Sequence, residues 1–205
     1  MKENIKEEII SNSRELFNEH GYHEVTMRMI ANKCNISVGN LTYYYAKKKD
    51  IMKELLESEE PQSSLNRINS LQDLYHFIYV MVDGVRKNHF FFSSSEMQSL
   101  DPDFFETNKN NVTKLHQEFM NCLLQLQNKK IISSSFSSYE MENYISTFML
   151  AHLSWANEEN KNSSYTSLSF EEFILSHFIL LKPYLTKKGL KELNTIIGNH
   201  YEAQD

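Results

Sequence analysis

Interruptions of secondary structure are scarce in this chain, and their scarcity limits the fold more than any other feature. The 205 residues include only five glycines and three prolines, the residue types that most often break helices and strands. Leu, Glu, Lys and Met are plentiful, and long segments contain no breaker. Hydrophobic residues make up 40% of the chain, enough to build a substantial core. The sequence therefore predicts an all-α protein.

Cysteine usage and the N-terminal segment indicate where such a protein works. Cys34 and Cys122 provide neither a disulfide framework nor a metal-ligand spacing, and we interpret them as small buried side chains in a reducing compartment. The first residues are charged and amphipathic, unlike a secretion signal, and no apolar run approaches the roughly 18 residues of a membrane span. These features predict a cytoplasmic protein that needs no cofactor or metal.

Positive charge is concentrated in the N-terminal quarter of the chain. The net charge is −6, but residues 1–56 carry +1 and the remainder carries −7. The span from Val25 to Lys49 contains no acidic residue, and its five basic residues are Arg28, Lys33, Lys47, Lys48 and Lys49. This local patch, and not the total charge, is what a polyanion would encounter.

Helical spacing and capping residues predict four helices in the same region. Apolar residues at helical intervals favour a first helix over about 4–20. Thr26 suits the N-cap of a short second helix, and Ser37 suits that of a third helix over 38 to about 44. A fourth helix is expected over about 48–57. Only about three residues join the second and third helices, which is the geometry of a helix-turn-helix.

The second helix of such a motif enters the major groove of DNA, with some side chains held inward and others facing the bases and phosphates. Leu41 is the predicted inward anchor, Gly39 lets the backbone approach closely, and Asn40 suits a base edge. Tyrosine hydroxyls suit phosphate oxygens, and Lys48 is the best single candidate for a phosphate contact. Taken singly, the tyrosines fit a core and the lysines fit a solvated turn, but their joint placement favours DNA. The predicted DNA-binding residues are Thr26, Arg28, Ser37, Val38, Gly39, Asn40, Thr42, Tyr43, Tyr44 and Lys48.

The stretch ELFNEHGYHEVTMRMIANKCNISVGNLTYYYAKKKDIM resembles the DNA-binding domain of TetR-family transcriptional regulators over residues 5–56. The resemblance implies that Thr26 caps the second helix and touches phosphate, that residues 38–43 read the groove, and that Tyr44 and Lys48 clamp phosphates. Asn35 stands where the family usually has a turn glycine, and asparagine is among the residues that best tolerate a positive φ.

The rest of the chain is predicted to form a second helical domain. A polar connector follows Pro61, which leads us to expect a DNA-binding domain over 1–56 and a ligand-binding and dimerisation domain over 57–205. Capping pairs predict helix starts at Ser70 with Asp73 and at Ser169 with Glu172. The expected helices span about 70–87, 102–128 after Asp101 as cap, 138–157, 170 to near Pro183, and 187–198.

Two sets of residues in this domain are predicted to have functions. In the family the last two long helices of this domain pair with those of a second subunit, and the predicted dimer residues are Tyr144, Ala151, Phe170, Phe173, Ile174, His177, Phe178 and Leu181. Bulky aromatics and methionines predict a pocket for a small hydrophobic ligand, lined by Phe91, Met97, Phe105, His116, Phe119, Met120, Phe148, His152 and Trp155. Each of these side chains equally suits a core.

These features together predict a homodimeric transcriptional regulator that binds a pseudo-palindromic operator and acts as a repressor released by a small hydrophobic ligand. One alternative is a helix-turn-helix protein whose second domain binds a protein partner. An all-helical enzyme is disfavoured, because the sequence lacks a Glu-x-x-His pair, a G-x-S-x-G motif and a phosphate-binding glycine loop.

Overall fold

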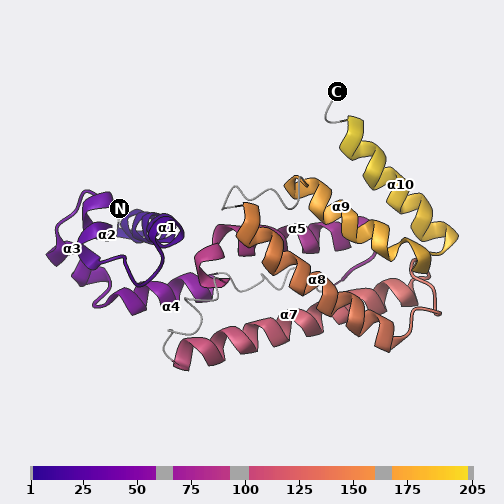
Figure 1. Cartoon of the computed structure of the whole chain (residues 1–205), viewed down its shortest axis with the longest axis horizontal. Helices are drawn as coiled ribbons and strands as arrows, with labels where there is room; N and C mark the ends of the chain where they lie inside the picture. Colours follow the sequence, from indigo (N-terminus) through magenta and orange to yellow (C-terminus); the bar gives the residue numbers. More distant parts are fainter. Residues whose placement is uncertain (1, 59–66, 93–101, 160–167, 203–205) are drawn as a thin grey trace. The chain divides into compact units, whose positions relative to one another are not determined.

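The computed structural model describes residues 2–58, 67–92, 102–159 and 168–202, and the regular elements in these ranges are helices. The all-α prediction is confirmed. The chain forms two compact units (Figure 1). Unit 1 comprises Met1–Glu60 and Gly84–Asn111, and unit 2 comprises Pro61–Asp83 and Val112–Asp205. The predicted connector after Pro61 and the predicted cap Asp101 lie outside the described residues.

Unit 1 begins with four helices whose limits follow from local signals. They are α1 (Lys2–His20), α2 (Met27–Lys33), α3 (Val38–Tyr44) and α4 (Lys48–Ser58). Gly21 ends α1 at a φ of 80°, and its amide bonds back to the Phe17 carbonyl. The predicted caps are confirmed: the Thr26 hydroxyl accepts from the Met29 amide at 3.2 Å, and the Ser37 hydroxyl accepts from the Asn40 amide at 3.0 Å.

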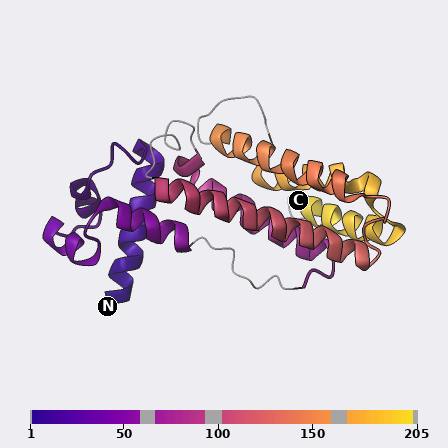
Figure 2. The same ribbon diagram turned by 90° about the horizontal axis from the view of Figure 1, so that it is seen from below.

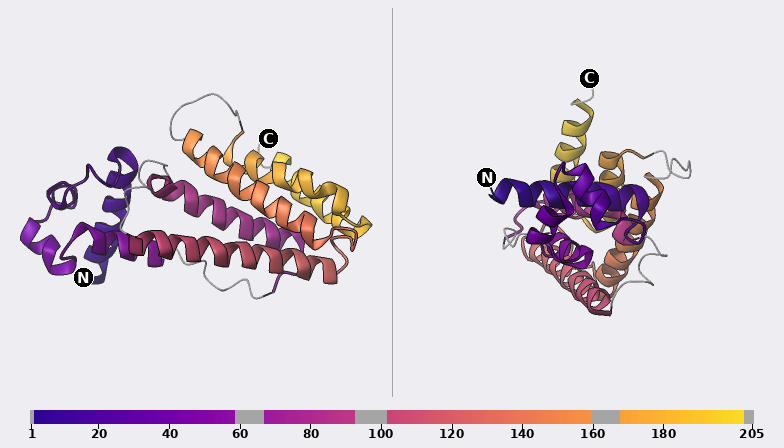
Figure 3. Two further views of the ribbon diagram at one scale, coloured as in Figure 1. Left: turned by 60° about the horizontal axis from the view of Figure 1, so that its bottom comes forward. Right: turned by 90° about the vertical axis from the view of Figure 1, so that its left-hand side faces the viewer.

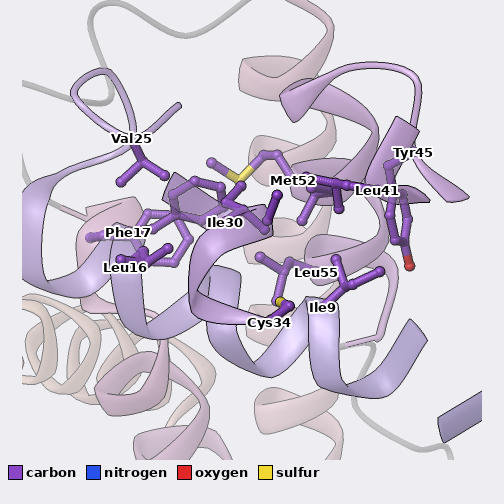
Figure 4. Close-up of a cluster of buried hydrophobic side chains, with 13 residues drawn as sticks. Ile9, Leu16, Phe17, Val25, Ile30, Cys34, Leu41, Tyr45, Met52 and Leu55 are labelled. Carbon is purple, nitrogen blue, oxygen red and sulfur yellow. The ribbon is translucent and has the colours of Figure 1, made fainter. Parts of the chain in front are cut away.

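A hydrophobic core joins these four helices (Figure 4). Ile9 and Phe17 of α1, Ile30 of α2, Leu41 of α3 and Met52 of α4 are all fully buried in it. Burial of a side chain of this size stabilises a fold by roughly 1.5–3 kcal/mol. The core therefore fixes the positions of α2 and α3 on the other two helices.

A short 3-10 helix, η2 (His89–Phe92), also belongs to unit 1. Phe90 packs against Phe17, with ring centroids 5.3 Å apart. The side-chain amide of Asn18 binds this segment twice, since its nitrogen donates to the Lys87 carbonyl at 2.7 Å and its oxygen accepts from the Phe90 amide at 3.2 Å. Unit 1 thus includes a segment that the sequence assigned to the second domain.

Unit 2 is a bundle of longer helices that lie lengthwise alongside one another (Figure 3). Its elements are α5 (Leu71–Lys87, in this unit as far as Asp83), α7 (Pro102–Asn128, from Val112), α8 (Ser138–Glu159), α9 (Phe170–Leu181), η3 (Lys182–Tyr184) and α10 (Lys187–Glu202). Reciprocal side-chain caps begin three of them, at Ser70 with Asp73, Ser137 with Glu140, and Ser169 with Glu172. Two of these three pairs were predicted. Pro183 lies in η3, where α9 has ended, as expected.

The end of the bundle is closed by contacts between the α7–α8 and α9–α10 connections (Figure 2). Ile132 and Leu185 form an antiparallel bridge, and the Thr186 hydroxyl donates to the Lys130 carbonyl at 2.7 Å. Gly189 in α10 lies so close that a Cβ there would stand 2.4 Å from the Ile131 carbonyl oxygen. The backbones approach this closely only because residue 189 is glycine.

Gly189→Ala is therefore expected to lower the free energy of unfolding by about 1–3 kcal/mol, because the backbone must shift to admit a methyl group. Gly198 in the same helix is the matched control, since a Cβ there would meet nothing within 4 Å. Gly198→Ala should raise stability by about 1 kcal/mol through helix propensity. Urea unfolding of both variants measures the difference, and equal effects would contradict the close approach at Gly189.

Candidate nucleic-acid interface

The α2–α3 pair of unit 1 has helix-turn-helix geometry. Cys34 caps the end of α2, and Asn35 then adopts a φ of 54° in the left-handed region. The Ile36 amide returns to the Ala31 carbonyl at 3.0 Å, which closes the turn. The prediction that Asn35 takes the role of a turn glycine is confirmed, because asparagine adopts this conformation at low cost.

Helix α3 is buried on one side and open on the other. Leu41 is fully buried, and Tyr45, directly after the helix, is also buried (Figure 4). The residues at the other positions of the first turns are exposed: Val38, Gly39, Asn40 and Thr42. A Cβ at Gly39 would meet only the Ser37 hydroxyl, at 3.8 Å. Internal packing therefore does not require glycine here, and the open backbone is available to a partner.

Two adjacent tyrosines extend the exposed side of α3. Tyr43 is 69% exposed, and its ring meets that of half-buried Tyr44 edge to face with centroids 5.2 Å apart. An exposed aromatic that is steadied by its neighbour presents a hydroxyl at a defined position. Such hydroxyls are common donors to phosphate oxygens.

The five basic residues of the acid-free window have different surroundings. The Lys33 ammonium pairs with the Glu15 carboxylate at 2.7 Å, and this hydrogen bond raises the pKa of Lys33. Lys48 binds backbone carbonyls of its own unit. Arg28, Lys47 and Lys49 are exposed, as is the cap residue Thr26. The structure thus brings together all ten predicted DNA-binding residues in one unit, but it turns the Lys48 ammonium towards the protein.

Most of the predicted pocket and dimer residues of unit 2 lie in one cluster of contacting rings. This aromatic cluster comprises Phe119, Tyr144, Phe148, His152, Trp155, Phe170, Phe173 and His177. Phe119 lies at its centre, edge to face with Phe148 at 5.3 Å, and Trp155 stacks on Phe173 at 4.7 Å. Six of the predicted dimer residues are buried in their own chain, and these are Phe170, Phe173, Ile174, His177, Phe178 and Leu181. Tyr144 and Ala151 are half-buried. A side chain that fills the core offers little surface to a partner.

Other predicted pocket residues are placed differently. His116 Nε2 lies 3.0 Å from a carboxylate oxygen of Glu142, and the His116 side chain is partly exposed. His116 therefore does not belong to the aromatic cluster. Met120 is half-buried. Met97 lies outside the described residues, as do the side chains of Phe91 and Phe105.

Two buried histidines belong to the cluster. His152 Nε2 lies 3.4 Å from the Val82 carbonyl oxygen, and His177 Nδ1 donates to the Phe173 carbonyl at 2.8 Å. Burial disfavours the charged imidazolium, which lowers the pKa of His152 to about 4 and lowers that of His177. Both side chains are therefore neutral near pH 7.

Some relevant residues had no sequence signal that assigned them. Asn18 and Phe90 join distant segments in unit 1, which spacing along the chain does not predict. Large exposed side chains on α8 and α9 were also missed, and these are Leu150, Ile179 and Leu180. Their exposure depends on which face of an apolar helix meets the core.

A capped helix-turn-helix with an exposed recognition helix, joined to a second helical unit, defines a helix-turn-helix DNA-binding protein. Residues 9–55 match the family described as bacterial regulatory proteins of the tetR family, and residues 49–193 match the family described as bacterial transcriptional repressor. The chain belongs to the TetR family of transcriptional regulators. Members of this family regulate transcription and are not enzymes.

Individual relatives agree with this assignment. The HTH-type transcriptional regulator UidR of Escherichia coli K12 is 27% identical over 77 residues, which span 38% of this chain and 39% of that protein. A TetR-family regulator from Marinobacter aquaeolei VT8 has the same fold, with a TM-score of 0.76, 22% identity, and coverage of 96% of this chain and 97% of the other. A transcriptional regulator from Saccharomonospora viridis, solved in complex with choline, has a TM-score of 0.69, 11% identity, and coverage of 91% and 100%.

Among the helices in the described ranges, none combines the length and the apolar character needed to cross a membrane.

Proposed function

We propose that this protein is a cytoplasmic, homodimeric repressor that binds a pseudo-palindromic DNA operator through α3 and releases it when a small hydrophobic ligand binds unit 2. The exposed side of α3 is the observation that carries the proposal. It combines an open glycine, an amide and a tyrosine on a helix held firmly by buried Leu41. A protein that uses this side only as a solvated surface has no need of such an arrangement.

Within this side, Asn40 is proposed to read a base. Its backbone amide is engaged by the Ser37 cap, whereas its side chain is exposed in the first turn of α3. An asparagine amide both donates and accepts, which matches the N6 and N7 positions of adenine in the major groove. Arg28, Lys47, Lys49 and Tyr43 are proposed to contact phosphates around it.

The proposed dimer surface is the outer side of α8 and α9. The two helices are antiparallel neighbours in unit 2, because Trp155 stacks on Phe173 while Tyr144 donates to the His177 carbonyl. Leu150 is 71% exposed on α8, and Ile179 and Leu180 are 56% and 58% exposed on α9. Large apolar side chains in such a group mark association surfaces.

Small uncharged residues lie beside Leu150 on the exposed side of α8. The exposed residues of α8 beside Leu150 include Ser146, Thr147 and Ser154, and Glu142 is the one charged residue between positions 141 and 155. Small side chains allow helices of two subunits to approach closely. A two-fold dimer formed this way presents two α3 helices, and operator half-sites about 34 Å apart accommodate them.

The ligand site is proposed to involve the aromatic cluster of unit 2. The side chains of this cluster are mostly apolar, and neutral His152 and His177 supply hydrogen-bonding atoms without a fixed charge. This composition favours an uncharged or weakly polar organic molecule. Release from DNA requires that the ligand bind more tightly to a state whose α3 helices no longer match the half-site spacing.

Asn40→Ala is the variant that tests the DNA-binding proposal. Selection of genomic fragments by wild-type protein should enrich one pseudo-palindrome, whereas Asn40→Ala should lose discrimination at one base pair in each half-site, worth about 1–3 kcal/mol. Asn194→Ala, at an exposed position of α10, is the control and should select as the wild type does. Uniform weakening at every base would mean that Asn40 touches only the DNA backbone.

A further inference from the structure

Two β-branched side chains lie on the exposed side of α3. Val38 is 41% exposed, and Thr42, further along the same helix, is exposed as well. Residues four apart on a helix are neighbours, with Cβ atoms about 5–6 Å from each other. Leu41 holds the helix to the core from its buried side. Val38 and Thr42 therefore form one small exposed surface on a fixed helix, which we call the Val38–Thr42 pair.

Packing and helix stability do not account for the residue types on this side. Valine and threonine lose rotamer freedom in a helix and rank below alanine, glutamate and lysine as helix formers. Gly39 and Asn40, which are exposed between them, rank low as well. A helix face that meets only water gains from strong helix formers. The composition of this side is therefore suited to contact with a partner.

Methyl groups are what the Val38–Thr42 pair offers to a partner. The Val38 side chain has no polar atom, so it makes only apolar contacts. The Thr42 hydroxyl donates its one proton to the Gly39 carbonyl at 3.0 Å, and the methyl group is the other branch of this side chain. Both side chains are restricted at χ1, so their methyl groups meet a partner with little further loss of rotamer freedom.

We propose that Val38 and Thr42 contact thymine methyl groups, so that each operator half-site carries thymine at the positions that they face. Thymine is the base that presents an apolar group, its C5-methyl, in the major groove, whereas the other base edges present hydrogen-bond donors and acceptors. Covering those donors and acceptors with a valine leaves them without partners, which weakens binding. The proposal rests on the DNA-binding function proposed above and adds a base preference that Asn40 does not supply.

Deoxyuridine in place of thymidine tests the proposal on wild-type protein, because it removes the C5-methyl and leaves every hydrogen-bonding group of the base unchanged. The operator is the site enriched by the genomic selection proposed above. Each thymine on either strand is replaced in turn, at equivalent positions of both half-sites. Affinity should fall about fourfold for each methyl contact that is lost, and hence about 15-fold for a symmetric pair of replacements at a contacted position.

Two variants assign the contacts to their side chains. Thr42→Ser removes only the methyl and keeps the hydroxyl that donates to Gly39, and Val38→Ala removes two methyl groups. Each should bind the unmodified operator about tenfold more weakly than wild type and lose its sensitivity to deoxyuridine at the base that it faces. Thr195→Ser is the matched control, since Thr195 is exposed on α10 and its hydroxyl donates to the Lys191 carbonyl at 3.2 Å. It should respond to deoxyuridine as wild type does.

Three results would overturn the proposal. They are half-sites without thymine, wild-type affinity that no deoxyuridine replacement changes, and a loss of affinity that is the same in wild type, Val38→Ala and Thr42→Ser. The last result would mean that the methyl groups act through the shape of the DNA and not through these side chains. The first two results need no variant to fold. If the selection enriches no site, the proposed function fails as well, whereas insensitivity to deoxyuridine at an enriched operator overturns this proposal alone.

Discussion

Replacing Ile179 and Leu180 together by aspartate is expected to separate the proposed dimer into monomers and to weaken operator binding strongly. Both side chains are more than half exposed on α9, so the variant can fold as a single chain. In the dimer, however, two carboxylates per subunit would lose water without a partner, at a cost of several kcal/mol. The dimer dissociation constant should rise at least about a thousandfold. Operator affinity should fall by roughly a hundredfold or more, because one α3 helix contacts only one half-site.

Sedimentation and operator gel shifts measure these two effects. Leu124→Asp is the matched control, since Leu124 is also a partly exposed leucine but lies on α7. It should remain a dimer and bind the operator normally. A double variant that sediments like wild type at the same concentration would show that subunits associate through another surface.

The second large effect concerns pH, because the wild-type protein is expected to lose stability as the pH falls below about 6.5. The pKa of His152 is about 4 in the folded chain, against 6.5 ordinarily. Between these values the unfolded chain binds a proton that the folded chain does not, so acid favours unfolding. The loss attributable to His152 should reach on the order of 2 kcal/mol at pH 5. The lowered pKa of His177 acts in the same direction.

His152→Phe isolates this contribution. Phenylalanine does not titrate and suits a site whose ring neighbours include Phe148 and Phe173. Urea unfolding gives the free energy of unfolding of each protein at pH 7 and at pH 5. The loss of this free energy between pH 7 and pH 5 should be smaller in the variant than in the wild type by on the order of 2 kcal/mol. Equal differences in the two proteins would mean that His152 titrates normally in the folded state.

Much of the helix-turn-helix followed from the sequence because its signals are local. Thr26 and Ser37 cap their own helices within three residues, and Asn35 needs only its own backbone conformation to replace glycine. Leu41 was assigned inward from its position in the helix-turn-helix and from the family resemblance, and it is fully buried. Local chemistry of this kind is decided before tertiary packing, so it can be recognised in a single sequence.

Contacts between distant segments could not be predicted in this way. The acceptors of Lys48 lie more than 20 positions away, and Asn18 binds Lys87 and Phe90 about 70 positions away. A charged residue in a basic window has the same sequence signature whether it faces DNA or its own backbone. The assignment of Lys48 to phosphate followed from its place in this window and from the family resemblance, and the structure shows its ammonium on backbone carbonyls of its own unit.

The apolar helices of unit 2 illustrate a second limit. Helix α9 has apolar residues around most of its circumference, so spacing does not separate a core face from a partner face. The sequence placed Phe170, Phe173 and Phe178 at the dimer surface, whereas the structure buries them and exposes Ile179 and Leu180. The helices proposed for dimerisation are unchanged, but the residues proposed for contact differ.

The most direct test of the account is a selection of genomic fragments with purified wild-type protein at about physiological salt, followed by a footprint on the enriched site. The account predicts a protected pseudo-palindrome whose half-sites lie about one helical turn apart on the DNA. Enrichment no greater than that of random fragments, or a protected site without two-fold symmetry, would contradict the proposal of a dimeric operator-binding regulator.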